Sequence, residues 1–477
     1  MILTHSAASL RRKADAAVRA GRFTEAAGLY RQEAAIYRRR GDSNGAKVEE
    51  AKADRYTSEI RLFAHPPGSA RRLPPNVRLQ KYEPAHGCYL GAFIDRDERL
   101  GRSFLDENSQ SHYDPDAFAD LTGRSHASVF CYLSYGRRFP LRWVERLKQR
   151  GVAPHIAWEP NQGLSAVQED RYLREFAEDA ARAECPIFLR FASEMNGQWT
   201  RYGGDPLQYR TKWGIVHRAM ARYAPNVAMV WCVNSIPEAP IARFYPGDEY
   251  VDWVGVACYS VPCHDNDPAR ASLWENPADL IRFVYDAYAG RKPIMVGEYG
   301  ASRRSAAEGR DRSAWAARKI SEMYASLPRL YPRIKCINLF NMNNLVYAAP
   351  GRQLNNYSIT DEETVRAAYA RAIRAPQFLS ALGDSASSPL VPLVSGKAAR
   401  QLAPNGILKV SAWARCPYAA RFTVRYAVDG REVFRSGEFG TYEATLSLPR
   451  LGSGQHRLSA TLTDERGVLA ARSEYRL

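Results

Sequence analysis

Eight short apolar runs, separated by segments long enough for a helix, constrain the fold of this chain most strongly. Apolar runs of four to eight residues are typical of strands buried on both faces of a parallel sheet. Strand and helix alternating eight times predicts an α/β fold, the (β/α)8 barrel. The runs occupy residues 88–94, 127–133, 153–158, 186–192, 226–233, 251–258, 293–298 and 334–340.

The first 65 residues follow a helical pattern, with small and apolar residues at three- and four-residue steps. Glycines at 21 and 41 interrupt it, and we expect a third helix at residues 43–63. Residues 16–42 resemble a tetratricopeptide-type helical pair. One such unit cannot form a solenoid groove alone. The segment is therefore interpreted as a helical cap or an oligomerisation element, and a protein-binding array is the alternative.

The C-terminal residues alternate apolar with polar side chains, which predicts strands. Asp429-Gly430 is a two-residue hairpin turn signal. The length of this C-terminal segment fits a β-sandwich of immunoglobulin or fibronectin type. The proline-rich stretch near residue 70 indicates a linker. The predicted domains are a helical segment (1–65), a linker (66–86), the barrel (87–384) and the sandwich (385–477).

Two glutamates, Glu194 and Glu298, each follow a buried apolar run and precede turn residues. In parallel barrels, catalytic residues lie at the C-terminal ends of the strands, where loops vary without disturbing the packed interior. Retaining glycoside hydrolysis needs two carboxyl groups about 5–5.5 Å apart, one acid and one nucleophile. The pair therefore indicates that chemistry, and rim residues in ordinary salt bridges are the alternative.

Five motifs carry a resemblance to a known family: HIAWEP, LRFASEMNGQW, NVAMVWCVN, FYPGDEYVDWVGVACYS and PIMVGEYG. From about residue 87 to 380 the chain resembles glycoside hydrolase family 26, mostly β-mannanases, with lichenases and xylanases. The resemblance implies that Glu194 is the general acid/base and Glu298 the nucleophile.

The resemblance also implies supporting residues. Arg190 matches a position whose guanidinium keeps the nucleophile ionised and oriented. Tyr259 matches a tyrosine that hydrogen-bonds the nucleophile, and Trp199 matches an aromatic platform for a sugar. An arginine among apolar strand residues must in any case find a carboxylate, and Glu298 is the obvious one.

Further residues near the acid/base are candidates for contact with sugar. Tyr202 shares the polar loop QWTRYGG with Trp199, which favours a platform, whereas ordinary packing is the alternative for Trp158. Ser193 stands where mannanases of the family usually carry histidine. Serine can hydrogen-bond a sugar hydroxyl but carries no charge, so the sugar stays open between β-mannan and β-glucan types.

The loop VPCHDND, residues 261–267, places His264 among cysteine and aspartates. This mixture of soft and hard ligands at such close spacing matches no standard metal site. We therefore expect a substrate-lining loop. No metal or cofactor is expected, because glycosidases of this type need none for their chemistry.

The formal net charge of +16 is spread unevenly: +8 lies in residues 1–86 and +6 in residues 391–477. Basic flanks around a nearly neutral barrel indicate contact with an anionic surface, either an acidic polysaccharide or membrane headgroups. A solvated arginine-rich surface is the alternative. Neither flank carries a nucleic-acid-binding motif, so nucleic acid is not an expected partner.

The sequence thus predicts a retaining endo-β-glycosidase that acts on a polysaccharide. A barrel that only binds polysaccharide, and a transglycosylase in which a sugar hydroxyl replaces water, are the alternatives. No signal peptide or transmembrane run is evident, so we expect a cytoplasmic protein, or a secreted or cell-surface one if a leader is missing. The helical segment before a glycosidase barrel further suggests exopolysaccharide processing.

Overall fold

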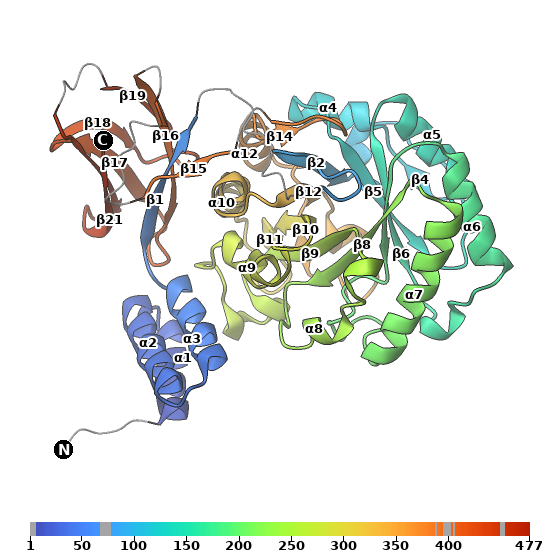
Figure 1. Cartoon of the computed structure of the whole chain (residues 1–477), viewed down its shortest axis with the longest axis horizontal. Helices are drawn as coiled ribbons and strands as arrows, with labels where there is room; N and C mark the ends of the chain where they lie inside the picture. Colours follow the sequence, from blue (N-terminus) through green and yellow to red (C-terminus); the bar gives the residue numbers. More distant parts are fainter. Residues whose placement is uncertain (1–5, 67–77, 387–388, 395–401, 404–405, 449–453) are drawn as a thin grey trace. The chain divides into compact units, whose positions relative to one another are not determined.

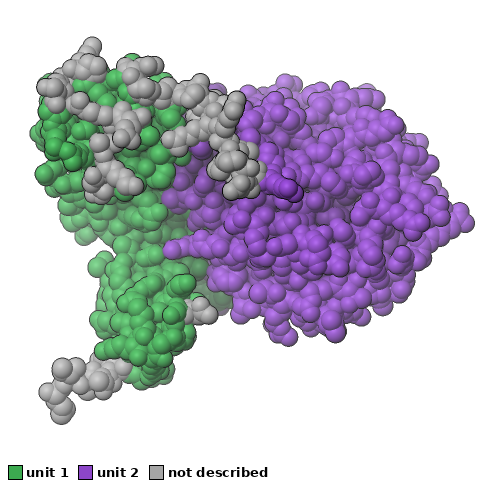
Figure 2. Space-filling model, in the orientation of Figure 1, with its two compact units in different colours: residues 1–68, 269–279, 390–477 green, residues 69–268, 280–389 purple. Residues whose placement is uncertain are grey.

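The computed structural model describes residues 6–66, 78–386, 389–394, 402–403, 406–448 and 454–477. The chain forms two compact units, shown in green and purple in Figure 2. Unit 1 comprises residues 1–68, 269–279 and 390–477, and unit 2 comprises residues 69–268 and 280–389.

Unit 2 is a closed barrel of eight parallel strands. Closure comes from β12, which pairs with β2 over Cys336–Phe340 and Tyr89–Phe93. The predicted barrel is confirmed. Each predicted apolar run overlaps one strand, and several of these strands extend one to three residues beyond the run. The strands are β2 (Cys88–Phe93), β5 (Ser128–Ser134), β6 (Ala153–Glu159), β7 (Ile187–Phe191), β8 (Val227–Asn234), β9 (Trp253–Ser260), β10 (Ile294–Ala301) and β12 (Ile334–Phe340).

Helices surround the barrel, as Figure 1 shows. Asp114, Asp170 and Asp205 begin three of them, each with a side-chain oxygen that accepts a backbone N–H of the first turn. The helices are α4 (Pro115–Thr122), α5 (Leu141–Gln149), α6 (Arg171–Arg182), α7 (Pro206–Tyr223), α8 (Ile241–Phe244), α9 (Pro277–Tyr288), α10 (Ser313–Leu330), α11 (Asn344–Tyr347) and α12 (Glu363–Ala372). No helix within the described ranges is both long and apolar enough to cross a membrane.

Large apolar side chains fill the barrel interior near the start of the strands, including Tyr89, Phe188, Trp253 and Met295. The described part of the predicted linker, from residue 78 onward, packs against this end. The indole of Trp253 donates to the Lys81 carbonyl at 2.7 Å. The rest of the predicted linker, residues 67–77, lies outside the described residues. Because one end of the barrel is packed, the polar interior groups lie toward the opposite end, where the strands finish.

Unit 1 begins with three helices, α1 (Ala7–Arg19), α2 (Phe23–Arg39) and α3 (Ser43–Arg55). Small residues such as Ala14, Ala17 and Ala26 are buried between them. The prediction that the third helix continues to residue 63 is wrong. The helix ends at Arg55, and Glu59–His65 forms strand β1, in which four of the seven residues are buried.

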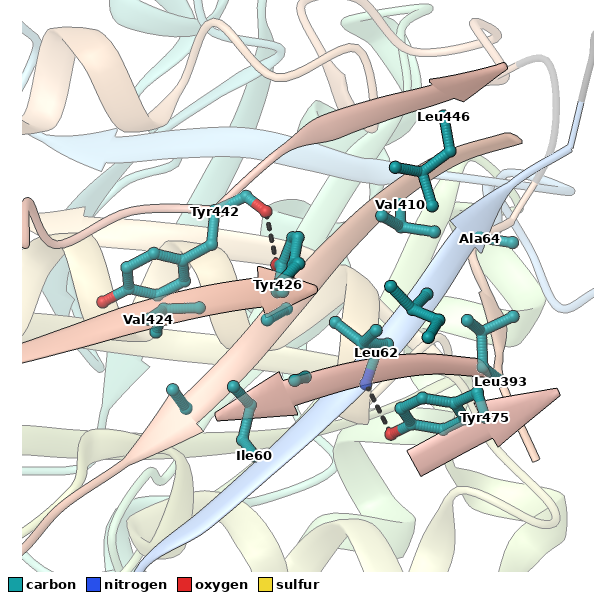
Figure 3. Packing of buried hydrophobic residues seen from close by; sticks show 14 of the residues in the cluster. Ile60, Leu62, Ala64, Leu393, Val410, Val424, Tyr426, Tyr442, Leu446 and Tyr475 are labelled. Carbon is teal, nitrogen blue, oxygen red and sulfur yellow. Dashed lines mark hydrogen bonds between the residues drawn. The ribbon is translucent and has the colours of Figure 1, made fainter. Parts of the chain in front are cut away.

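Unit 1 also contains two four-stranded antiparallel sheets, in the orders β15-β1-β16-β19 and β18-β17-β20-β21. Their facing sides share one apolar core, part of which Figure 3 shows. There the backbone N–H of Leu62 donates to the Tyr475 hydroxyl at 3.1 Å. The strands are β15 (Val391–Pro392), β16 (Ile407–Arg415), β17 (Phe422–Val428), β18 (Arg431–Ser436), β19 (Ala444–Ser447), β20 (Arg457–Asp464) and β21 (Leu469–Arg476).

The hairpin predicted at Asp429-Gly430 is present, because both residues have positive φ and join the paired strands β17 and β18. The all-β character of the C-terminal region is likewise confirmed. The sheet of β16 also takes β1 from the N-terminal region, antiparallel from Glu59↔Arg415 to His65↔Lys409, a pairing that the sequence pattern did not predict. The resemblances of the N-terminal helices to a tetratricopeptide pair and of the C-terminal sheets to an immunoglobulin fold stay predictions. The boundaries of the four predicted domains also stay predictions.

Candidate active site

A cleft of about 1020 Å³ opens at the C-terminal ends of the barrel strands. Both predicted catalytic residues, Glu194 and Glu298, line it, together with Ser193, Trp199 and other residues of the surrounding loops. The strands deliver these side chains to one place because all eight run parallel and end at the same rim.

Glu298 lies within β10, which continues beyond it to Ala301, so it is not at the end of the strand as predicted. The pairing of β10 with β9 shifts register between Val296 and Glu298. The intervening Gly297 has no room for a side chain, since a Cβ there would lie 2.6 Å from the Cys232 sulfur. Glycine at this position therefore allows the backbone to approach the interior closely, next to the carboxylate.

Three donors hold the Glu298 carboxylate. The guanidinium of fully buried Arg190 donates to Oε1. The hydroxyl of Tyr132, on β5, donates to the same oxygen at 2.5 Å, and the hydroxyl of Tyr259, on β9, donates to Oε2. Burial raises the pKa of both tyrosines well above the usual value, and the Glu298 charge adds to this, so both hydroxyls stay protonated donors.

Arg190 is itself fixed from several sides. Its second terminal nitrogen donates to the Gly297 carbonyl at 3.2 Å. The guanidinium carbon lies 5.2 Å from the ring centre of Phe130 and 5.7 Å from that of Tyr132, within cation–π range. The arginine therefore has one orientation, in which it faces Glu298.

Glu194 has a different environment. The Asn234 side-chain amide donates to its Oε1 at 2.8 Å, and the Trp199 indole donates to its Oε2 at 2.8 Å. Burial raises the pKa of Glu194 to about 7, and the charge of Glu298 acts in the same direction. The hydrogen bonds from Asn234 and Trp199 oppose that rise. A substantial fraction of Glu194 is therefore protonated near neutral pH.

The backbone at Glu194 is strained. Both Ala192 and Glu194 adopt positive φ values, 47° and 58°, which cost energy for residues other than glycine. The Glu194 N–H donates to the Cys232 carbonyl at 2.9 Å and so helps to hold this conformation. The strained turn directs the Glu194 side chain toward Asn234 and Trp199.

A third carboxylate, Glu159 at the end of β6, supports this turn. The Ser193 hydroxyl donates to Glu159 Oε1 at 2.7 Å, and the Ser193 N–H donates to Oε2 at 3.0 Å. The Tyr202 hydroxyl donates to Oε2 at 2.6 Å. Burial raises the pKa of Glu159. The charge of Arg190 and the hydrogen bonds from Tyr202 and Ser193 oppose this rise.

The three predicted sugar platforms differ in exposure: one is open to the cleft and two are buried. Trp199 is 45% exposed and lines the cleft, so its ring is open to a ligand. Tyr202 also lines the cleft but is only 6% exposed, which leaves little ring surface for a sugar. Trp158 is fully buried and stacks on Phe176 of α6 with ring centres 3.9 Å apart. The sugar-contact prediction for Trp158 is therefore wrong, because its ring packs between barrel wall and helix.

His264 lies in a short turn, His264–Asn266, and is not among the residues that line the cleft. We expected the loop 261–267 to line the substrate cleft, and His264 does not meet that expectation. Within the described parts of the chain, no group of three or more histidine, cysteine, aspartate or glutamate side chains is arranged to hold a metal ion.

Sequence reasoning missed three residues of the site: Tyr132, Glu159 and Asn234. Each lies at or near the end of a strand that the apolar runs correctly predicted. A polar side chain closing a buried run was the signal that could have identified Glu159 and Asn234. Tyr132 gave no such signal, because tyrosine in a strand is ordinary.

Part of the chain matches a known protein family. Residues 163–286 match the family model described as Glycosyl hydrolase family 26. The predicted resemblance to this family is confirmed. The matched segment includes Arg190, Glu194, Asn234 and Tyr259, and Glu298 follows it.

Two relatives and one solved structure are among the proteins to which the chain is similar. A β-1,3-xylanase, TXYA, of Vibrio sp is 29% identical over 122 residues, which is 25% of this chain and 24% of the relative. Endoglucanase H of Acetivibrio thermocellus is 25% identical over 279 residues, which is 54% of this chain and 29% of the relative. The structure of a GH26 β-mannanase from Bacteroides ovatus aligns with 15% identity and a TM-score of 0.43, over 63% of this chain and 92% of that chain. The chain thus spans less than a third of the length of these two relatives.

Proposed function

We propose that the barrel is a retaining, endo-acting β-glycosidase that cleaves a β-linked polysaccharide of mannan or glucan type. One observation carries the proposal: two carboxyl groups in one cleft have opposite environments. Burial raises the pKa of Glu194 to about 7, whereas Glu298 accepts hydrogen bonds from Arg190 and two tyrosines. Pairs of carboxyl groups whose surroundings differ in this way divide the acid and nucleophile roles between them.

In the first step, Glu298 attacks the anomeric carbon and the bond to the leaving oxygen breaks. Protonated Glu194 gives its proton to that oxygen, so the shortened chain leaves as an alcohol. Arg190 and Tyr259 orient the attacking carboxylate, because each binds one of its two oxygens. The product of this step is a glycosyl ester on Glu298.

In the second step, ionised Glu194 removes a proton from water while the water oxygen attacks the anomeric carbon. The ester bond breaks, Glu298 returns as a carboxylate, and Glu194 is protonated again. Two inversions leave the configuration of the sugar unchanged. Asn234 and Trp199 stabilise the ionised form of Glu194 that this step requires.

The size of the cleft supports action within a chain. At about 1020 Å³ it is at the upper end of the usual range for small-molecule sites. Loops that follow several different strands line it, including those bearing Asn161, Trp199 and Asn344. The similarity to a β-1,3-xylanase and an endoglucanase supports polysaccharide as the substrate class.

The test is azide rescue of Glu194→Ala on an aryl glycoside with a good leaving group. Such a substrate needs no proton for departure, so the first step proceeds and the ester accumulates. We expect azide to accelerate turnover of Glu194→Ala and to give a glycosyl azide of retained configuration, because azide attacks the ester on Glu298. In Glu298→Ala, azide takes the place of the missing nucleophile and should give a glycosyl azide of inverted configuration, whereas the surface control Glu178→Ala should show no acceleration. An inverted azide from Glu194→Ala, or a retained azide from Glu298→Ala, would contradict the assignment.

A further inference from the structure

Four arginines line the cleft from four different loops of unit 2. Arg96 follows β2 and Arg137 follows β5, while Arg201 lies in the loop after β7 and Arg352 in the loop after β12. All four are exposed. They approach the cleft from separate parts of the sequence because the parallel strands that carry them end at one rim.

The side chains of these four arginines are not neutralised by neighbouring acids. Within the described ranges, none of them has a carboxylate at ion-pair distance. Arginines on the outer helices differ: Arg171 pairs with Glu175 and Arg174 with Glu178, each at 2.7 Å. Arg352 makes one hydrogen bond, to the Trp199 carbonyl at 3.2 Å.

The carboxylates that share the cleft have partners of their own. Glu298 is paired with buried Arg190. Asp95 accepts a hydrogen bond from His112 at 2.8 Å, and its charge helps to raise the pKa of that histidine to about 9 despite the opposing effect of burial. Glu159 accepts from Ser193 and Tyr202, as described above. The positive charge at the mouth of the cleft is therefore left to attract a ligand.

We propose that the cleft binds a polysaccharide bearing carboxylate groups, which Arg96, Arg137, Arg201 and Arg352 receive. The inference rests on the proposed function, because it names the substrate class of the same site. A guanidinium presents two parallel N–H groups that match the two oxygens of a carboxylate. Sulfate esters share this oxyanion chemistry, and the experiment distinguishes them.

Two of the arginines lie near the proposed reaction centre. Arg352 donates to the carbonyl of Trp199, whose indole donates to Glu194, and Arg201 lies two residues beyond Trp199. A carboxylate bound by this pair would belong to a sugar near the cleaved bond. Arg96 and Arg137 extend the positive charge along other walls of the cleft.

The experiment measures binding to the full chain carrying Glu298→Gln, so that no ligand is consumed. The ligands are soluble β-glucan and β-mannan, the same polymers oxidised at C6 to uronic acids, and their sulfate esters. Dissociation constants are compared for three proteins: this background alone, with Arg201→Gln and Arg352→Gln added, and with Arg371→Gln and Arg374→Gln added. The last pair removes the same charge from an exposed part of unit 2 outside the cleft.

We expect an oxidised polymer to bind at least tenfold more tightly than its neutral parent. The cleft double variant should weaken that binding about tenfold, and the control variant should not change it. Added salt should weaken binding of the oxidised polymer, because exposed charges are screened.

Equal binding of oxidised and neutral polymers, or equal loss in both double variants, would overturn the inference. Preference for the sulfate esters would overturn the carboxylate assignment. An activated 2-deoxy-2-fluoroglycoside applied to the unaltered protein separates these failures from failure of the proposed function. If Glu298 is labelled but one of these contrary binding results is found, the carboxylate-bearing substrate is refuted and the proposed glycosidase function stands.

Discussion

Arg190 and Glu298 face each other in the barrel interior, where the buried guanidinium donates to one oxygen of the carboxylate. Tyr259 donates to the other oxygen. The carboxylate therefore has one orientation, set by side chains from β7 and β9. This geometry leads to the prediction that loss of a single donor reduces the rate while the fold persists.

Tyr259→Phe should lower kcat/KM about tenfold to a hundredfold, the usual effect of losing one hydrogen bond to a charged group. The ring remains, so its packing against Tyr357, with centres 4.9 Å apart, should persist. Steady-state kinetics and thermal unfolding check this. Tyr223→Phe, which removes a hydroxyl from α7, is the control. Unchanged kcat/KM in Tyr259→Phe would argue that this hydrogen bond plays no part in the rate.

The pH dependence of the rate should follow the protonation of Glu194. Its pKa is raised to about 7, so the acid form is present below pH 7 and is lost as the pH rises through that value. Asn234→Ala removes a donor that favours the ionised form, so it should raise the pKa and move the alkaline limb upward by roughly half a unit. Profiles of kcat/KM against pH, with Gln149→Ala as a surface control, measure the shift. A downward shift would contradict the assigned role of Asn234.

Glu159 should act by positioning the turn that carries Glu194. Glu159→Gln keeps the size of the side chain but turns one of its two acceptors into a donor, facing the donors of Ser193 and Tyr202. We expect kcat to fall about tenfold with a smaller change in KM, since the loss concerns alignment. Ser193→Ala removes one of the three bonds and should have a milder effect. Wild-type kcat in Glu159→Gln would refute the positioning role.

Strand β1 should be essential to the core of the two antiparallel sheets of unit 1. Leu62→Ala removes a fully buried side chain from this core and should lower the free energy of unfolding by about 3 kcal/mol. Ile407→Ala, at a position 51% exposed on the adjacent strand β16, should cost less than about 1 kcal/mol. Thermal unfolding, with hydrogen exchange of β16 amides to assign the transition, checks both values. Equal effects of the two substitutions would mean that β1 adds little to this core.

The barrel could be predicted because its strands are buried on both faces, and continuous apolar runs such as residues 226–233 are visible in the sequence. Strand β1 was missed because its residues directly follow a helical pattern and its partner, β16, lies some 350 residues further on. Local periodicity carries no information about such distant pairing.

The site was predictable where a motif names its residues. The motifs identified Glu194, Glu298, Arg190 and Tyr259 as candidates. In the structure three of them line the cleft, and buried Arg190 contacts Glu298 from behind it. Trp158 was misjudged because the inward or outward direction of a strand residue depends on the register of the closed barrel. The buried link between Glu159 and Ser193 depends on the folded path of two loops, which the sequence pattern does not encode.

Covalent trapping identifies the carboxylate that forms the glycosyl ester. The protein is incubated with activated 2-deoxy-2-fluoroglycosides of the mannosyl, glucosyl, xylosyl and cellobiosyl types, and the adduct is located by intact-mass measurement and peptide mapping. We expect one glycosyl adduct per chain, on Glu298. An adduct on Glu194 or Glu159, or turnover of the same glycosides without any trapped ester, would contradict it.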